Sequence, residues 1–183
     1  MNEPAPHGHW PKAARTSDGI PYRIRPIRRT DGALERAFFA SLSPQSKYLR
    51  FMHCMNEPSE EFIAQLVNVD YHATMALAAV SGENAGERFV GVARYAADEN
   101  GRDCEFAVAV SDDWQCRGIG TTLAPMLFEY AAAEGFESIY GTVLADNQRM
   151  LELSEWLGLT LEPAVAGQPT VRASRRFSPA RRK

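Results

Sequence analysis

A short glycine-containing segment, Gln115-Cys-Arg-Gly-Ile-Gly-Thr121, combines features that bind anionic ligands. It follows an apolar run that ends at Val110 and opens a stretch with helical periodicity. The first backbone N–H groups of a helix have no partner within the helix, and the helix dipole adds positive potential there. Glycines at 118 and 120 would let a phosphate approach these groups closely. This segment, called the glycine loop below, therefore predicts a phosphorylated ligand.

The spacing of the glycine loop excludes two common nucleotide motifs. A dinucleotide-binding G-x-G-x-x-G would need a third glycine where the chain has Leu123, and a P-loop would need a lysine that is absent. A G-x-G pair alone also fits a loop that merely packs a helix against a sheet. The loop by itself thus leaves its ligand unidentified.

An acidic residue, Glu105, lies within the apolar run 104–110. Burial among apolar neighbours would raise the pKa of its carboxyl toward the range of a general base. An alternative follows from the turn signal Asn100-Gly101, because a two-residue turn pairs Ala96 with Glu105 and puts Arg94 diagonal to it on the same face. An ion pair there would lower that pKa instead. The residues alone leave both roles open.

The elements that must position these residues follow from periodicity and from capping residues. Runs of β-forming residues predict seven strands, at 22–27, 74–80, 89–96, 104–110, 139–144, 159–162 and 170–177. Helical spacing and helix-start signals predict helices beginning near Thr30 or Asp31, Ser43-Pro44, Pro58, Ile119, and Asp146 or Asn147. Their order indicates one mixed α/β domain.

Composition supports a single cytoplasmic domain. The chain has 183 residues, 45% of them hydrophobic and 23% charged, which suits one globular core. No apolar run is long enough to cross a membrane, and the N-terminus resembles no export signal. We expect residues 1–21 to be a tail or loosely docked arm, 22–177 the folded domain, and 178–183 a basic tail.

Metal and nucleic acid are not favoured as partners. Cys54, Cys104 and Cys116 are widely spaced, as in a reducing compartment, and the four histidines form no paired ligand motif. We therefore expect no metal. Residues 172–183 carry six basic and no acidic side chains, which we interpret as a solvated end rather than a nucleic-acid site.

With Gln115 three residues before Gly118 and five before Gly120, the glycine loop resembles the Q/R-x-x-G-x-G/A coenzyme A loop of the GNAT superfamily of acyltransferases. Residues 22–177 look like the whole GNAT topology, a central, mixed but mostly antiparallel sheet of about seven strands flanked by helices. The segment Leu42–Phe51, together with Glu105-Phe-Ala-Val and Asp112-Asp-Trp-Gln, is similar to the acetyltransferase domain of bacterial Pat-type protein lysine acetyltransferases.

The resemblance implies acetyl-CoA as acyl donor. It places the pantetheine arm along the strand end and the pyrophosphate on the amides of the glycine loop. The cofactor-binding residues it implies are Val108, Ala109, Val110, Gln115, Cys116, Arg117, Gly118, Ile119, Gly120, Thr121 and Asn147. Each has a plainer alternative; Asn147, for example, could be only a helix cap. The resemblance also assigns the general base to Glu105.

Amine acetylation needs such a base, because a lysine with a pKa of ~10.4 is only about 0.04% neutral at pH 7. We therefore expect an enzyme that moves acetyl from acetyl-CoA to a primary amine by direct attack, with protein lysine as preferred acceptor. The acceptor groove should be lined by residues 43–72 and by the loop before Thr170. The alternatives are acetylation of a small amine or amino acid, and a coenzyme A-binding module without turnover. The sequence leaves open whether the chain is a monomer or a homodimer.

Overall fold

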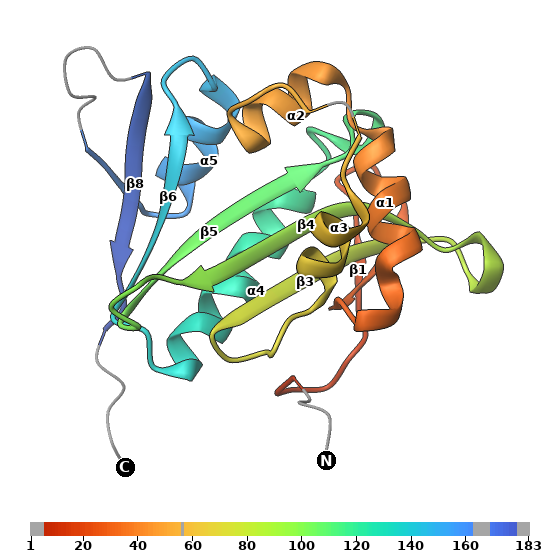
Figure 1. The fold of residues 1–183 in the computed structure, drawn as a ribbon, viewed down its shortest axis with the longest axis horizontal. Helices are drawn as coiled ribbons and strands as arrows, with labels where there is room; N and C mark the ends of the chain where they lie inside the picture. Colours follow the sequence, from red (N-terminus) through yellow and green to blue (C-terminus); the bar gives the residue numbers. More distant parts are fainter. Residues whose placement is uncertain (1–5, 56, 163–168, 179–183) are drawn as a thin grey trace.

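Eight strands form one sheet, in the order β1-β2-β3-β4-β5-β6-β8-β7, within the residues that the computed structural model describes, 6–55, 57–162 and 169–178 (Figure 1). Neighbouring strands are antiparallel except β5 and β6, which are parallel. The strands are β1 (Lys12–Arg15), β2 (Pro21–Pro26), β3 (Thr74–Ser81), β4 (Arg88–Ala97), β5 (Asp103–Val110), β6 (Ser138–Leu144), β7 (Thr160–Leu161) and β8 (Thr170–Arg176).

The helices cover both faces of this sheet, with α1 and α3 on one face and α4 on the other (Figure 1). Ser43 and Ser59 cap α2 and α3, since their hydroxyls accept the amide protons of Ser46 and Phe62. The predicted helix starts are thus confirmed there. The helices are α1 (Gly32–Ser41), α2 (Pro44–Phe51), α3 (Glu60–Val67), α4 (Ile119–Glu134) and α5 (Gln148–Trp156).

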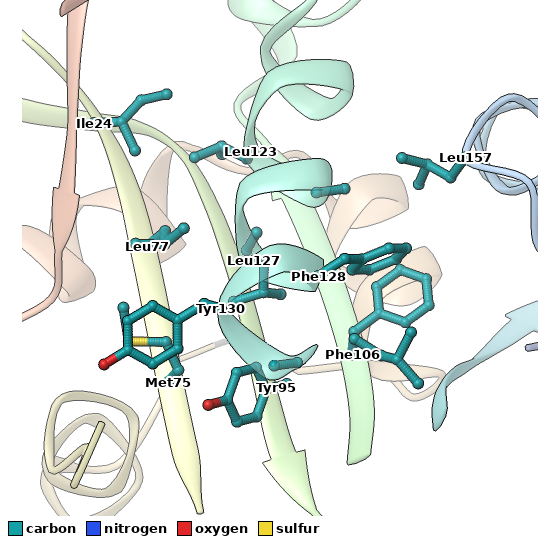
Figure 2. Close-up of a cluster of buried hydrophobic side chains, with 14 of the residues drawn as sticks. Ile24, Met75, Leu77, Tyr95, Phe106, Leu123, Leu127, Phe128, Tyr130 and Leu157 are labelled. Carbon is teal, nitrogen blue, oxygen red and sulfur yellow. The ribbon is translucent and has the colours of Figure 1, made fainter. Parts of the chain in front are cut away.

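Two apolar layers hold the helices on the sheet. Alternate residues of β3 point to opposite faces, which explains why the strand reads as a continuous apolar run. Leu77 packs with Leu123 and Leu127 of α4 on one face (Figure 2), while Ala78 packs with residues of α1 on the other. The core therefore fixes the position of α4, whose first turn carries the glycine loop.

The N-terminal segment corrects our prediction. Residues 12–15, expected to lie in a tail or arm, form edge strand β1, which pairs Lys12 with Ile24 of β2. This is the eighth strand, beyond the seven predicted. Its side chains are mostly exposed, so it carries no apolar alternation from which a strand could be recognised. Of the predicted basic tail, residues 179–183 lie outside the described part of the chain.

The sheet opens between β5 and β6. The predicted hairpin register is confirmed, because Ala96 lies opposite Glu105. On the other side, β5 pairs with β6 only from Asp103 to Glu105, against Ser138 to Tyr140. Beyond these residues the two strands separate toward the end of the sheet where α2 and α5 lie (Figure 1). The backbone of residues 108–110 therefore lies beside a gap.

A close contact marks the place where the two strands separate. A Cβ added at Gly141 of β6 would lie 2.8 Å from a ring carbon of Phe106, which is too close for any side chain. The Phe106 ring also packs edge-on against Phe128 of α4, with 4.9 Å between ring centroids. The ring thus has α4 on one side and the β6 backbone on the other.

We expect Gly141→Ala to destabilise the fold, because the Phe106 ring or β6 must move to admit the methyl group. Overpacking of this kind costs roughly 1–3 kcal/mol of unfolding free energy, measurable by urea denaturation. Gly86→Ala is the matched control, since a Cβ there meets nothing within 4 Å. Equal stability of the two variants would contradict this account of the β5–β6 junction.

Candidate active site

A cavity of about 1310 Å³ lies where β5 and β6 separate. Its walls come from α2, α3, β4, β5, the glycine loop, β6 and α5, so one hollow joins the predicted cofactor segments to residues of 43–72. The predicted site residues in its walls are Glu105, Val108, Ala109, Val110, Gln115, Cys116, Gly118, Ile119, Gly120, Thr121 and Asn147. Part of the predicted acceptor groove, the loop at 163–168, lies outside the described residues.

The glycine loop has the geometry of an anion-binding helix start. Gly118 is left-handed, with φ of 84°, and so is Cys116, with φ of 60°. The hydrogen bond from the Thr122 amide to the Gly118 carbonyl begins the regular helical pattern. The amides of residues 119–121 precede it and therefore have no acceptor within the helix. The hydroxyl of Thr121 also donates to the Gly118 carbonyl. The loop therefore offers free N–H groups to the cavity.

The side chain of Arg117 lies apart from the rest of the predicted cofactor-binding set. Its guanidinium donates to Asp18 at 3.0 Å, and its carbonyl accepts from the amide of Ser17. It is the one member of the predicted cofactor-binding set, all of which is described, that does not line the cavity. The turn between β1 and β2 takes up this side chain. Sequence reasoning missed the contact because residues 1–21 were expected to be an arm.

Gln115 connects three elements at the mouth of the cavity. Its Nε2 donates to the Val110 carbonyl at 3.1 Å and to the Ser46 hydroxyl at 3.2 Å. Its Oε1 accepts from Arg149 of α5 at 2.6 Å. The prediction included Gln115 but missed Ser46 and Arg149. For Arg149 a signal existed, because a cation in the first turn of a helix opposes the helix dipole.

Asn147 lies in the cavity wall and also caps a helix. Its side-chain oxygen accepts the amide proton of Met150 at 3.2 Å, at the start of α5. The predicted helix cap is thus confirmed, while the binding role of Asn147 stays a prediction. Because the cap uses the side-chain oxygen, the NH2 group of Asn147 is the part of the side chain that can donate to a ligand.

Glu105 lies in the cavity, but the predicted burial is wrong. Its side chain is exposed, and the Thr142 hydroxyl donates to its Oε1 at 2.8 Å. The alternative ion pair with Arg94 is also absent from the described residues, since Arg94 pairs with Glu35 at 2.7 Å. The side chain is open to the cavity beside it, so the desolvation that we expected is not present.

Two arginines, Arg50 and Arg94, line the cavity beside Glu105, and Arg94 pairs with the buried carboxylate of Glu35. Burial raises the pKa of the Glu35 carboxyl against the opposing effect of Arg94. Burial, and then the charge of Arg94, lowers the pKa of Arg50 to about 10. Arg50 of α2 is half-buried, lines the cavity and forms no ion pair within the described part of the chain. The cavity wall therefore contains, near Glu105, a cation that lies over the Phe51 ring and forms no ion pair among the described residues.

Helix α2 is held over the cavity by polar contacts at its start and by an aromatic contact at its end, where the Phe51 ring packs against rings of α1 and α3. The Asp112 carboxylate accepts from the Ser43 amide at 2.9 Å and from the hydroxyls of Ser43 and Ser46 at 2.8 and 2.9 Å. Partial burial acts to raise the pKa of Asp112, but these hydrogen bonds outweigh it and hold that pKa below its usual value. The loop after β5 thus fixes the start of α2.

Two further classes of site are absent from the described residues. Among them, no cluster of three or more His, Cys, Asp or Glu side chains could hold a metal ion. None of the helices they form has the length and apolarity to cross a bilayer.

Comparison with known proteins agrees with this geometry. The chain belongs to the acetyltransferase (GNAT) family, whose model matches residues 37–159. It is 36% identical to an acetyltransferase of Pseudomonas aeruginosa over 150 residues, covering 82% of this chain and 80% of the relative. It is 29% identical to the acetyltransferase Pat of Mycolicibacterium smegmatis over 140 residues, which are 75% of this chain and 40% of that protein.

A solved structure shows the same fold. The GNAT domain of S. lividans Pat superposes with a TM-score of 0.84 at 24% identity, covering 93% of this chain and 99% of the domain. The chain is therefore a GNAT acetyltransferase, and its acyl donor is acetyl-CoA, the donor of this family. The cavity fits that donor, since it combines an open strand edge with free amides at a helix start.

We expect Asp112→Asn to loosen α2, because the amide retains one oxygen for three donors. Exposed hydrogen bonds of this kind contribute little, so the unfolding free energy should fall by about 0.5–1 kcal/mol. Amide hydrogen exchange should quicken in α2 more than in α1. Asp113→Asn, a change at the exposed neighbouring position, is the control.

The effect of Asp112→Asn should depend on pH. Because the folded pKa of Asp112 lies below its ordinary value, its contribution is complete above the unfolded pKa and is lost as pH falls through the folded pKa. Wild type and variant should therefore differ in stability at neutral pH and converge in acid. A difference that persists unchanged in acid would contradict the assignment.

Proposed function

We propose that this chain is a cytoplasmic N-acetyltransferase that transfers the acetyl group of acetyl-CoA to a lysine side chain of a protein, with Glu105 as general base. The observation that carries the proposal is that Glu105 lies in the same cavity as the glycine loop and the open edge of β5. Similarity to two proteins named Pat supports the choice of acceptor.

The surroundings of Glu105 suit a proton acceptor. Thr142 donates to Oε1, while Oε2 has no hydrogen bond within the described residues and faces no competing ion pair. Arg50 lines the same cavity, and a nearby cation lowers the pKa of an incoming ammonium group.

Glu105→Gln should lower the amine-dependent release of coenzyme A by at least about 100-fold, because the amide cannot accept the ammonium proton. The dissociation constant for acetyl-CoA, measured by calorimetry, should stay unchanged. Glu129→Gln, on α4 at the opposite face of the sheet, is the control.

Two results would separate the alternatives. Unchanged turnover in Glu105→Gln would remove Glu105 from the mechanism while leaving an acetyltransferase. Binding of acetyl-CoA without thiol release, for any protein or small amine tested, would instead indicate a coenzyme A-binding module.

A second candidate acceptor is an amine that also bears a carboxylate, such as an amino acid. Arg50 favours it, because a partly buried guanidinium without an ion pair is suited to bind an anion. With Glu105 lining the same cavity, the wall would then match both charges of a zwitterion. A protein lysine offers such an anion only through a neighbouring side chain.

Kinetics with matched acceptors will distinguish these candidates. For a carboxylate-binding Arg50, Arg50→Gln should lower kcat/KM for an ω-amino acid roughly tenfold more than for the alkylamine of equal length. For a protein acceptor, a lysine peptide should exceed both in kcat/KM. Lys47→Gln is the control, since Lys47 lies on α2 over Phe39 and outside the cavity wall.

A further inference from the structure

Arg149 lies at the mouth of the cavity, on the first turn of α5. Its guanidinium donates to the side-chain oxygen of Gln115 at 2.6 Å. This bond joins the glycine loop that follows β5 to the helix that follows β6. It therefore bridges the two elements that flank the opening between these strands.

The position of Arg149 is electrostatically unfavourable as the structure stands. A cation in the first turn of a helix is repelled by the positive end of the helix dipole. Arg149 is exposed and forms no ion pair within the described residues, and its partner Gln115 is neutral. The start of α4, with its own free amides, is the next element around the cavity. The mouth thus brings together a guanidinium and the positive ends of two helices, and within the described residues none of Asp112, Asp146 and Glu152, acidic side chains that also line the cavity, forms an ion pair with Arg149.

We propose that Arg149 binds the diphosphate of the acyl donor, and that its guanidinium moves from the Gln115 side chain to a phosphate oxygen when the donor enters. Arginine forms charge-assisted, bidentate hydrogen bonds to phosphate, which are stronger than a bond to a neutral amide. The amides of residues 119–121 and Arg149 then contact the same anion. The inference rests on the proposed function in that the ligand is a coenzyme A thioester.

Two contacts make this exchange possible without disturbing the glycine loop. Gln115 keeps its Nε2 bonds to the Val110 carbonyl and the Ser46 hydroxyl when its oxygen is released. Arg117, the cation within the loop itself, is held by Asp18 outside the cavity wall. Arg149 therefore supplies the mobile positive charge that the loop does not provide.

Calorimetric titration with coenzyme A tests the assignment without any acceptor. Arg149→Gln should weaken binding of coenzyme A roughly tenfold, as expected for one charge-assisted hydrogen bond. Arg149→Lys, which retains the charge, should recover part of the loss. Arg102→Gln is the control, because Arg102 is an exposed arginine paired with Glu137 near the other end of β5.

Shorter ligands identify the group that Arg149 binds. Pantetheine lacks phosphate, so wild type and Arg149→Gln should bind it equally. Dephospho-coenzyme A keeps the diphosphate but lacks the 3′-phosphate, so the tenfold difference should persist with it. Loss of the difference with dephospho-coenzyme A would assign Arg149 to the 3′-phosphate and overturn the proposal. Equal weakening for pantetheine would overturn it as well, by showing a structural role.

The salt dependence gives an independent check of the same point. Binding of coenzyme A by wild type should weaken more steeply with added salt than binding by Arg149→Gln, because screening acts on the charge that the variant lacks. Identical slopes and identical affinities would overturn the proposal. If wild type fails to bind coenzyme A at all, the proposed function fails instead, so the two failures are distinguishable.

Discussion

The site depends on the point at which β5 and β6 stop pairing. Backbone N–H and C=O groups need partners, and a strand that leaves its neighbour in mid-sheet exposes them along one edge. Here the parallel pairing ends at Glu105, and the Phe106 ring lies against Gly141 immediately beyond it. Residues 108–110 remain bonded to β4 on their other side. A polar ligand arm can therefore complete β5 without unfolding any part of the sheet.

Charge divides the cavity into two functional ends. At the mouth, two helix starts and Arg149 produce positive potential suited to a diphosphate. Near Glu105 the wall carries both signs of charge, because Arg50 and Arg94 line the cavity with it, while Thr142 donates a hydrogen bond to Glu105. A bound donor and acceptor would exclude water from the same space.

Local signals predicted much of this arrangement. Asn100-Gly101 specified the hairpin register that places Glu105, and Ser43 and Ser59 specified helix starts, because each acts through neighbours in the chain. The errors concern contacts distant in sequence. Strand β1 lacks apolar alternation, the unforeseen ion pair of Arg117 with Asp18 joins residues 99 positions apart, and Glu105 is exposed although its neighbours in the strand are apolar. None of these is encoded within a short window.

The attachment of α2 to the rest of the cavity wall differs from that of α4. A helix packed by buried apolar side chains resists displacement, because moving it exposes core surface. No residue of α2 is fully buried, and its start is held by hydrogen bonds from Ser43 and Ser46 to Asp112, whereas its end is held by the Phe51 ring, which packs against rings of α1 and α3. Water can replace such bonds at little cost. The start of α2 is therefore the part of the cavity wall that moves at least cost, while the wall built on α4 and the sheet keeps its geometry.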